Sequence, residues 1–195
     1  MNRGYKDKIE MSLPWMFSKS KKEMFQNYCS LANEYFEYGC GGSTFAASKL
    51  LPHEKIHSVE SDPIWISKVK EVLSNVHIQN IDIGPISEFG YPATESKWSV
   101  WPSYSEAWTT IPNTADLVLI DGRFRVACLL WICLNPNSVK WIFFDDFQSR
   151  PQYSCVLEFV DILKRADDLI VCKPKENLDI EKCSLLYQKY KYNPE

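Results

Sequence analysis

The chain has 195 residues, which suits a single domain, and its hydrophobic content of 45% is enough for a sizeable core. A net charge of −3 provides no basic footprint for nucleic acid, so no nucleic-acid partner is expected. Seven cysteines without a C-x-x-C pair favour reduced thiols in a cytoplasmic protein. With no signal-peptide pattern and no apolar run long enough to span a bilayer, no membrane association is expected either.

The chain opens with an irregular extension, residues 1–19, and then a predicted helix over about 21–32. Ser20-Lys21-Lys22-Glu23 has the pattern of a capping box, and apolar residues follow it at helical spacing from Met24 to Leu31. We expect this helix to cover one edge of a sheet. Two interpretations of the extension stay open: it folds over a ligand site, or it is mobile.

The run Tyr35 to Thr44 contains a predicted strand, a glycine-rich turn and the start of a helix that continues from Phe45 to Leu51. Glycine lets a backbone turn sharply and approach a ligand closely. Gly39 and Gly41 fit the dinucleotide-binding pattern, but its third glycine is replaced by Thr44. Glu37, at the tip of the strand, would repel a pyrophosphate and attract an ammonium group. The alternative is a tight turn that binds nothing.

Two further strands are predicted after the glycine loop. The first, Lys55 to Glu60, precedes Asp62-Pro63, which has the N-cap and first-turn residues of a helix that runs through Leu73. Glu60 follows Gly39 by 21 residues, the interval at which a second strand brings an acid to a ribose. Val76 to Ile83 alternates as a third strand, with Asp82 at its end as either a ligand contact or a turn former.

Residues 84–113 differ from the rest in being rich in proline and aromatic residues. Such a long irregular segment in a compact domain is usually a lid or a binding loop. Aromatic faces suit flat or amphipathic acceptors, so Trp98 and Trp101 are predicted to bind substrate. The alternative is that the aromatic residues only pack the insert onto the domain.

The remaining elements begin with a buried-type strand, Asp116 to Asp121, and a helix from Arg123 to Leu130. A second apolar strand, Val139 to Asp146, ends in two acids. A helix is then predicted from Arg150-Pro151 with the apolar face Val156, Leu157, Phe159, Val160 and Leu163. Leu169 to Cys172 and Cys183 to Tyr187 are predicted as a final antiparallel pair. This alternation indicates an α/β, doubly wound, mostly parallel sheet in one domain, residues 1–195.

The predicted strand ends carry the acids Glu37, Glu60, Asp82, Asp121, Asp145 and Asp146. The carboxyl ends of parallel strands lie at one edge of the sheet, where ligands bind. Asp121, Asp145 and Asp146 could converge there on a hard divalent cation such as Mg²⁺. The alternative is that Asp145 and Asp146 cap the following helix.

The acid-spacer-G-x-G pattern of Glu37 to Gly41 resembles the first motif of class I S-adenosylmethionine-dependent methyltransferases. This resemblance implies a seven-stranded Rossmann-like sheet with an antiparallel C-terminal strand. It also implies that the loop holds the methionine portion of the cofactor and that Glu60 holds its ribose. The implied cofactor-binding residues are Glu37, Gly39, Cys40, Gly41, Ser43, Thr44, Glu60, Asp82 and Asp121.

The acids Asp121, Asp145 and Asp146 also look like the metal site of cation-dependent O-methyltransferases. Phe124 stands where the catechol-type enzymes carry a lysine base, so Asp121 or Asp145 becomes the candidate catalytic base. Arg123 and Arg125 flank that position; they either clamp an anionic or polyhydroxylated acceptor or balance the acidic edge.

Together these features predict an O-methyltransferase that acts on a sugar or another small polyol, with S-adenosylmethionine and a divalent cation as cofactors. Two alternatives remain: a non-catalytic or regulatory domain that retains the cofactor fold, and an NAD or nucleotide-sugar enzyme on a similar sheet. Glu37 and the missing third glycine count against NAD.

Overall fold

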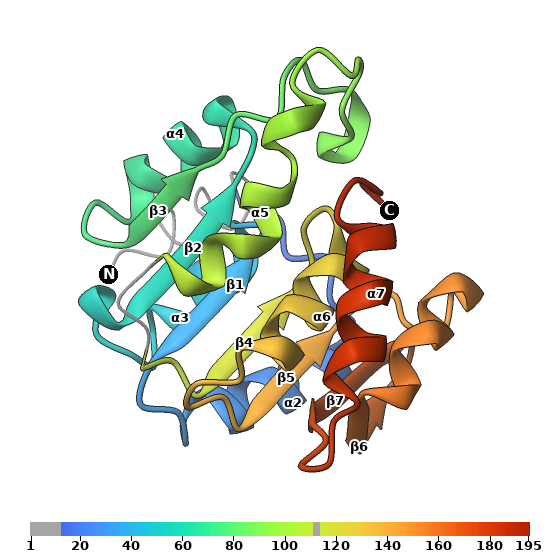
Figure 1. The fold of residues 1–195 in the computed structure, drawn as a ribbon. Helices are drawn as coiled ribbons and strands as arrows, with labels where there is room; N and C mark the ends of the chain where they lie inside the picture. Colours follow the sequence, from blue (N-terminus) through green and yellow to red (C-terminus); the bar gives the residue numbers. More distant parts are fainter. Residues whose placement is uncertain (1–12, 111–113) are drawn as a thin grey trace.

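A seven-stranded sheet forms the centre of the computed structural model, which describes residues 13–110 and 114–195 (Figure 1). The strand order is β3-β2-β1-β4-β5-β7-β6. The bounds are β1 (Tyr35–Tyr38), β2 (Ile56–Glu60), β3 (His77–Asn80), β4 (Leu117–Ile120), β5 (Trp141–Phe144), β6 (Val160–Ala166) and β7 (Leu169–Pro174). The first five strands pair in parallel, whereas β7 runs antiparallel to both β5 and β6. The predicted mostly parallel, seven-stranded sheet is confirmed.

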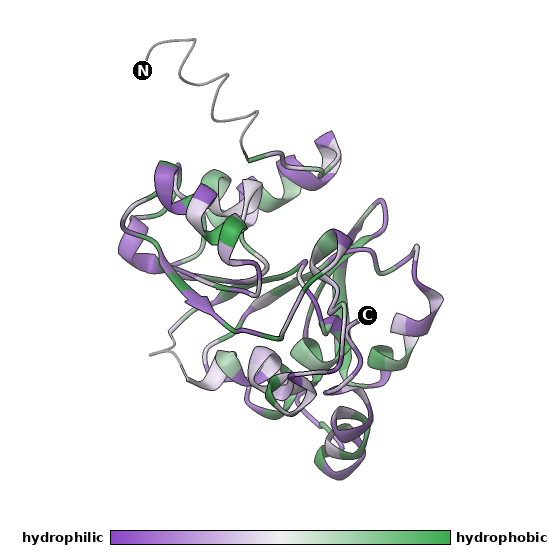
Figure 2. Cartoon of the chain, turned by 90° about the horizontal axis from the view of Figure 1, so that it is seen from above, coloured by the Kyte–Doolittle hydropathy of each residue, from purple (hydrophilic) through white to green (hydrophobic). Residues whose placement is uncertain are grey.

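Helices cover both faces of the sheet (Figures 1 and 2). One face carries α2 (Lys19–Cys29), α3 (Gly42–Ala47) and α4 (Pro63–Val72), and the other carries α5 (Pro102–Glu106), α6 (Arg125–Leu134) and α7 (Ile180–Tyr190). Short 3₁₀ helices complete the set: η1 (His53–Lys55), η2 (Glu88–Gly90), η3 (Trp98–Val100), η4 (Ala107–Thr109) and η5 (Pro151–Glu158). Side chains alternate across each strand, so the two layers pack as two separate hydrophobic clusters.

The helix starts follow local chemistry. Asp62 accepts from the backbone N–H groups of Ile64 and Trp65, and Pro63 occupies the first turn of α4, as predicted. The first described helix begins earlier than predicted because its N-cap is Ser18, whose hydroxyl accepts from the N–H of Lys21. The capping box predicted at Ser20 is therefore wrong in position.

Two C-terminal predictions are wrong. The helix expected after Arg150-Pro151 is only η5, and Val160 and Leu163 lie in strand β6. The strand expected over Cys183 to Tyr187 is part of helix α7, and β7 pairs with β6 instead. Cys183 and Tyr187 are both buried and four residues apart, which is the spacing of one helix face.

The proline-rich insert is largely packed rather than open. Its described residues, 84–110, form η2, η3, α5 and η4. Trp101, Tyr104 and Trp108 are buried in the hydrophobic cluster that also contains the apolar side chains of α6. The structural alternative for the aromatic residues therefore holds for these three. Residues 1–12 and 111–113 of the predicted extension and insert lie outside the described residues.

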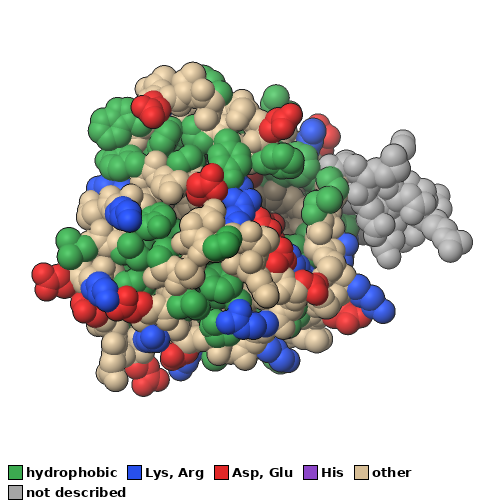
Figure 3. Space-filling model, turned by 90° about the vertical axis from the view of Figure 1, so that its right-hand side faces the viewer, with side chains coloured by type: hydrophobic (Ala, Val, Ile, Leu, Met, Phe, Trp, Pro, Cys, Tyr) green, Lys and Arg blue, Asp and Glu red, His purple; other side chains and the backbone are tan. Residues whose placement is uncertain are grey.

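Within the described residues, no helix combines the length and the apolar character needed to cross a membrane. On the face seen in Figure 3, acidic and basic side chains are interspersed among hydrophobic ones instead of forming a patch of one sign. This pattern agrees with the small net charge of −3.

Candidate functional site

A cavity of about 200 Å³ lies at the carboxyl ends of β1, β2 and β4. Strand β1 has β2 on one side and β4 on the other, so the strand order reverses at this point. Ligands of doubly wound sheets bind at such a switch point. The glycine loop, Glu60, Ser61 and the residues Asp121, Gly122 and Arg123 line the cavity.

The floor of the cavity is made by two glycines whose backbones touch. Gly39 has a φ of +90°, and a Cβ added there would lie 2.9 Å from the Cα of Gly122. A Cβ on Gly122 would in turn lie 2.9 Å from the backbone nitrogen of Gly39 and would overlap the hydroxyl of Tyr104. The two strand ends can approach this closely only because neither residue has a side chain.

The described part of the N-terminal extension passes over the glycine loop. Pro14, Trp15 and Met16 line the cavity, and a Cβ on Gly42 would lie 2.7 Å from the Cα of Trp15. Of the two interpretations of the extension, residues 14–16 follow the first, in which the segment folds over the candidate site. Trp15 was not singled out by the sequence, because nothing local marks a residue that packs against a loop almost 30 positions later.

Glu37 is fully buried and does not line the cavity. Its carboxylate accepts hydrogen bonds from the hydroxyls of Tyr35 (2.7 Å), Ser43 (2.6 Å), Ser58 (2.6 Å) and Thr44. Burial raises the pKa of Glu37, and the four hydroxyls oppose that shift. The carboxylate joins β1, β2 and α3, so the structure does not support the prediction that it faces an ammonium group.

Glu60 lies at the cavity wall, where the sequence predicted it. Its carboxylate accepts from the backbone N–H groups of Cys40 (3.2 Å), Ser61 (2.7 Å) and Asp62 (2.9 Å). Burial raises its pKa, whereas these N–H groups lower it. The side chain therefore ties the end of β2 to the glycine loop beside the cavity.

Asp82 lies in a second cavity, of about 460 Å³, which adjoins the first at Ser61. Its carboxylate accepts from the N–H of Gly84 (3.0 Å) and pairs with Lys97 of the insert. The hydrogen bond from Lys97 lowers the pKa of Asp82. Because the two cavities share a wall, an elongated ligand could extend from the glycine loop to Asp82.

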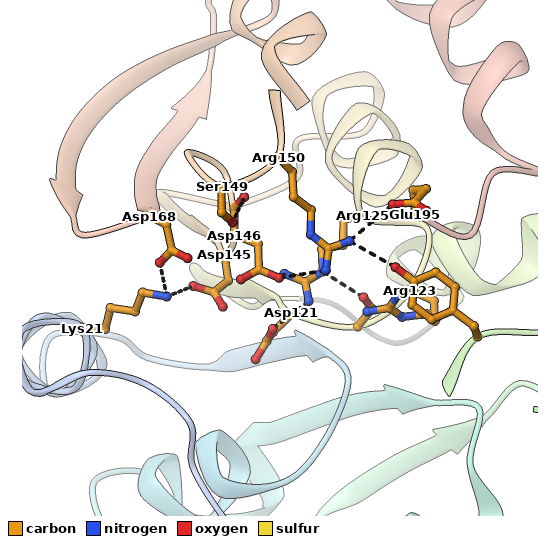
Figure 4. A network of polar contacts seen from close by, with 12 residues as sticks. Lys21, Asp121, Arg123, Arg125, Asp145, Asp146, Ser149, Arg150, Asp168 and Glu195 are labelled. Carbon is orange, nitrogen blue, oxygen red and sulfur yellow. Dashed lines mark hydrogen bonds and ion pairs between the residues drawn. The ribbon is translucent and has the colours of Figure 1, made fainter. Parts of the chain in front are cut away.

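The acids at the ends of β4 and β5 are paired with cations, one of which, Lys21, comes from a distant part of the chain (Figure 4). Lys21 of α2 binds Asp145 at 2.7 Å and also pairs with Asp168. Arg125 of α6 lies 3.0 Å from Asp121 and 3.1 Å from Asp146. Arg150 lies 3.1 Å from Asp146 as well.

This pairing does not suit a metal ion. Across residues 13–110 and 114–195, no group of three or more His, Cys, Asp or Glu side chains is arranged to hold one. Asp121, Asp145 and Asp146 were predicted to share a divalent cation, but the ammonium of Lys21 and the guanidiniums of Arg125 and Arg150 bind their oxygens instead. The metal prediction is not supported, because the protein neutralises these carboxylates with its own cations.

Asp121 is the acid of this cluster that reaches the cavity. Its loss of hydration raises the pKa to about 7, although Arg125 lowers it. Such a carboxyl group is partly protonated near neutral pH, which is suitable for a general base. Asp145, the other predicted base, is 5% exposed and does not line the cavity.

The two predicted arginines differ in their surroundings. Arg125 is buried between Asp121 and Asp146, which agrees with the charge-balancing alternative. Arg123 lines the cavity, is 6% exposed, and its guanidinium lies 4.0 Å from the ring centre of Tyr91.

The tryptophans predicted to bind substrate lie elsewhere. Trp101 is buried, donates to the carbonyl of Ile83 and packs against Phe124, so its ring has no face free for a ligand. Trp98 is half exposed and packs against Tyr192. Neither lines the two cavities described above.

No family model matches the sequence, and no curated protein sequence matches it. Solved structures, by contrast, match this chain. A methyltransferase-like protein from Silicibacter pomeroyi has a TM-score of 0.81 and 27% identity, over 93% of this chain and 98% of that one. The N-methyltransferase NodS from Bradyrhizobium japonicum, in complex with S-adenosyl-L-homocysteine, has a TM-score of 0.50 and 12% identity, over 87% and 98% of the two chains.

The fold is that of the class I methyltransferases. Within this methyltransferase fold, the cavity gathers six of the residues predicted to bind cofactor: Gly39, Cys40, Gly41, Ser43, Glu60 and Asp121. Glu37 and Thr44 lie beneath it, where Thr44 accepts from the N–H of Gly41 at 2.7 Å. The methyltransferase fold thus separates the predicted motif into residues that face the cavity and residues that support the loop.

Proposed function

We propose that the protein is an S-adenosylmethionine-dependent methyltransferase whose active site is the cavity at the β1–β4 switch point. The observation that carries this proposal is the lining of that cavity: a glycine loop with the carboxylates of Glu60 and Asp121 beside it. Two carboxylates repel a pyrophosphate and favour a ligand that carries hydroxyl and ammonium groups. The similarity to a methyltransferase-like protein supports the same conclusion.

The residues present fit this cofactor. Gly39 and Gly41 line the cavity, where the methionine portion would lie against the loop backbone. Glu60 would accept hydrogen bonds from the ribose hydroxyls, and the adjoining cavity near Asp82 would take the adenine. When bound, the cofactor supplies an electrophilic methyl group.

For the acceptor we propose a hydroxyl group of a small sugar or polyol. Asp121 lines the cavity with a pKa raised to about 7 by desolvation, so it would accept the hydroxyl proton. Most of the remaining rate enhancement would come from positioning of the acceptor. A divalent cation has no part in this proposal, because Lys21, Arg125 and Arg150 bind the carboxylates that would hold one.

One observation favours a second candidate, a non-catalytic domain with the same fold. With Trp15 against Gly42, the cavity at the glycine loop measures only about 200 Å³, below the roughly 300–1,000 Å³ usual for small-molecule sites. A domain that serves as a binding or regulatory module would not need a larger cavity.

Calorimetry and thermal unfolding with S-adenosylhomocysteine and NAD test the proposal. We expect S-adenosylhomocysteine to bind and to raise the melting temperature, and NAD to do neither, because only a ligand of the native state stabilises it. Absence of any response to S-adenosylhomocysteine would favour the non-catalytic domain. If it binds, a screen of sugars, catechols and peptides with methyl-labelled cofactor tests transfer, with Asp121→Asn as the matched variant.

A further inference from the structure

Among the described residues, Arg123 differs from the neighbouring arginines because no carboxylate pairs with it. Arg125 pairs with Asp121 and Asp146, and Arg150 pairs with Asp146 and Glu195. Within the part of the chain that the structure describes, no carboxylate lies within ion-pair distance of the Arg123 guanidinium, and its Nη1 is buried without a hydrogen-bond partner. Figure 4 shows Arg123 to one side of the acid–cation cluster.

The position of this guanidinium is held from several sides. Its plane lies over the ring of Tyr91, 4.0 Å from the ring centre, and the hydroxyl of Tyr91 accepts from Arg150 at 3.1 Å. The backbone N–H of Arg123 faces the hydroxyl of Tyr104 at 3.4 Å. A cation that is 94% buried and lacks an anion is unfavourable unless a ligand supplies one.

We propose that Arg123 binds a carboxylate group of a ligand in the cavity. The guanidinium presents a planar fork of donors that matches the two oxygens of a carboxylate. Stacking on Tyr91 orients that fork before the ligand arrives, which lowers the entropy lost on binding. This inference rests on the proposed function, since Arg123 lines the same cavity as Asp121 and the glycine loop.

The carboxylate has two possible sources, the amino-acid portion of the cofactor or the acceptor. The experiment compares wild type, Arg123→Gln, Arg123→Lys and the matched control Arg165→Gln, whose side chain is exposed on β6. Calorimetry measures the affinity of each variant for S-adenosylhomocysteine and for 5′-methylthioadenosine, which lacks the carboxylate. Ligand-observed NMR in saturating S-adenosylhomocysteine measures the binding of a sugar acid, glucuronate, and of its neutral amide, glucuronamide.

If the cofactor supplies the carboxylate, Arg123→Gln should weaken the binding of S-adenosylhomocysteine by about ten- to a hundredfold. The affinity for 5′-methylthioadenosine should not change. If the acceptor supplies it, both cofactor analogues bind as in wild type, and the variant loses binding of glucuronate but not of glucuronamide. Arg123→Lys should recover part of either loss because it keeps the charge without the fork.

Unchanged binding of S-adenosylhomocysteine in Arg123→Gln, together with no preference of wild type for glucuronate over glucuronamide, would overturn the proposal. Circular dichroism of each variant checks that it is folded. Failure of wild type to bind either cofactor analogue is a separate result, because it refutes the proposed function. Binding of glucuronate and glucuronamide measured without cofactor then tests the carboxylate site alone.

Discussion

Two carboxylates lie near the ends of neighbouring strands beside the glycine loop, and they have different surroundings. Glu37 is fully buried and accepts hydrogen bonds from four side-chain hydroxyls. Glu60 instead lines the cavity and accepts from backbone N–H groups. Both have a pKa raised by burial. The comparison teaches that an acid near a strand end can either support the glycine loop through hydrogen bonds or face a ligand in the cavity. Whether its side chain lines the cavity decides between the two roles.

The largest effect is expected from Glu37→Ala. It leaves four buried hydroxyls without their acceptor, which should lower the free energy of unfolding by about 3 kcal/mol. Urea unfolding measures this, with the exposed Glu54→Ala as the control, expected within about 0.5 kcal/mol of wild type. Similar stability of the two variants would show that the hydrogen bonds between Glu37 and the four hydroxyls do not stabilise the loop.

For Glu60→Gln we expect weaker ligand binding rather than a large loss of stability. A neutral amide at the cavity wall accepts less strongly from ribose hydroxyls, so affinity for S-adenosylhomocysteine should fall about tenfold. Calorimetry measures this change beside Glu37→Gln. If the two variants bind equally well, the division between a supporting and a ligand-facing carboxylate is wrong.

The pH dependence of methyl transfer tests the third carboxylate, Asp121. Its pKa is raised to about 7, and only the ionised form accepts a proton. The kcat/KM should therefore rise as pH increases through about 7 and level off above it. Asp121→Asn should remove that rise along with most activity; a variant with the wild-type pH profile would exclude Asp121 as the base.

The smallest effect is expected at the second cavity, for Lys97→Ala. Lys97 and Asp82 are both largely exposed, and an exposed ion pair contributes at most about 1 kcal/mol. Stability should change little, and affinity for S-adenosylhomocysteine by less than about threefold. A larger loss of affinity, measured by calorimetry against Lys49→Ala, would place Lys97 in direct contact with the ligand.

Much of the fold could be predicted from local patterns. Asp62-Pro63 starts α4 as expected, and the strands ending near Glu37, Glu60 and Asp121 lie where apolar runs meet turn residues. The C-terminal elements were mistaken because short apolar runs do not distinguish a strand from a helix. Val160 to Ala166 becomes a strand because the edge of β7 is there to pair with it.

The candidate site was predicted only in part, because local patterns mark some of its residues and not others. Gly39, Gly41 and Glu60 are marked by spacing and line the cavity. Arg125 was marked as a charge-balancing residue four positions after Asp121, but the partner of Asp145 was not marked, since Lys21 lies 124 residues from it in the sequence. No local pattern reports a contact over such a separation.

The sequence by itself determined the parallel strands from β1 to β5, the glycine turn and the acids near the strand ends, because backbone preferences and side-chain periodicity act over a few residues. Only the tertiary structure decided the surroundings of each charge: Glu37 accepts from four buried hydroxyls, Asp145 pairs with Lys21, and Arg123 lines the cavity with no carboxylate partner among the described residues. The physical reason is that hydration and ion pairing depend on neighbours brought together by packing, which are distant along the chain.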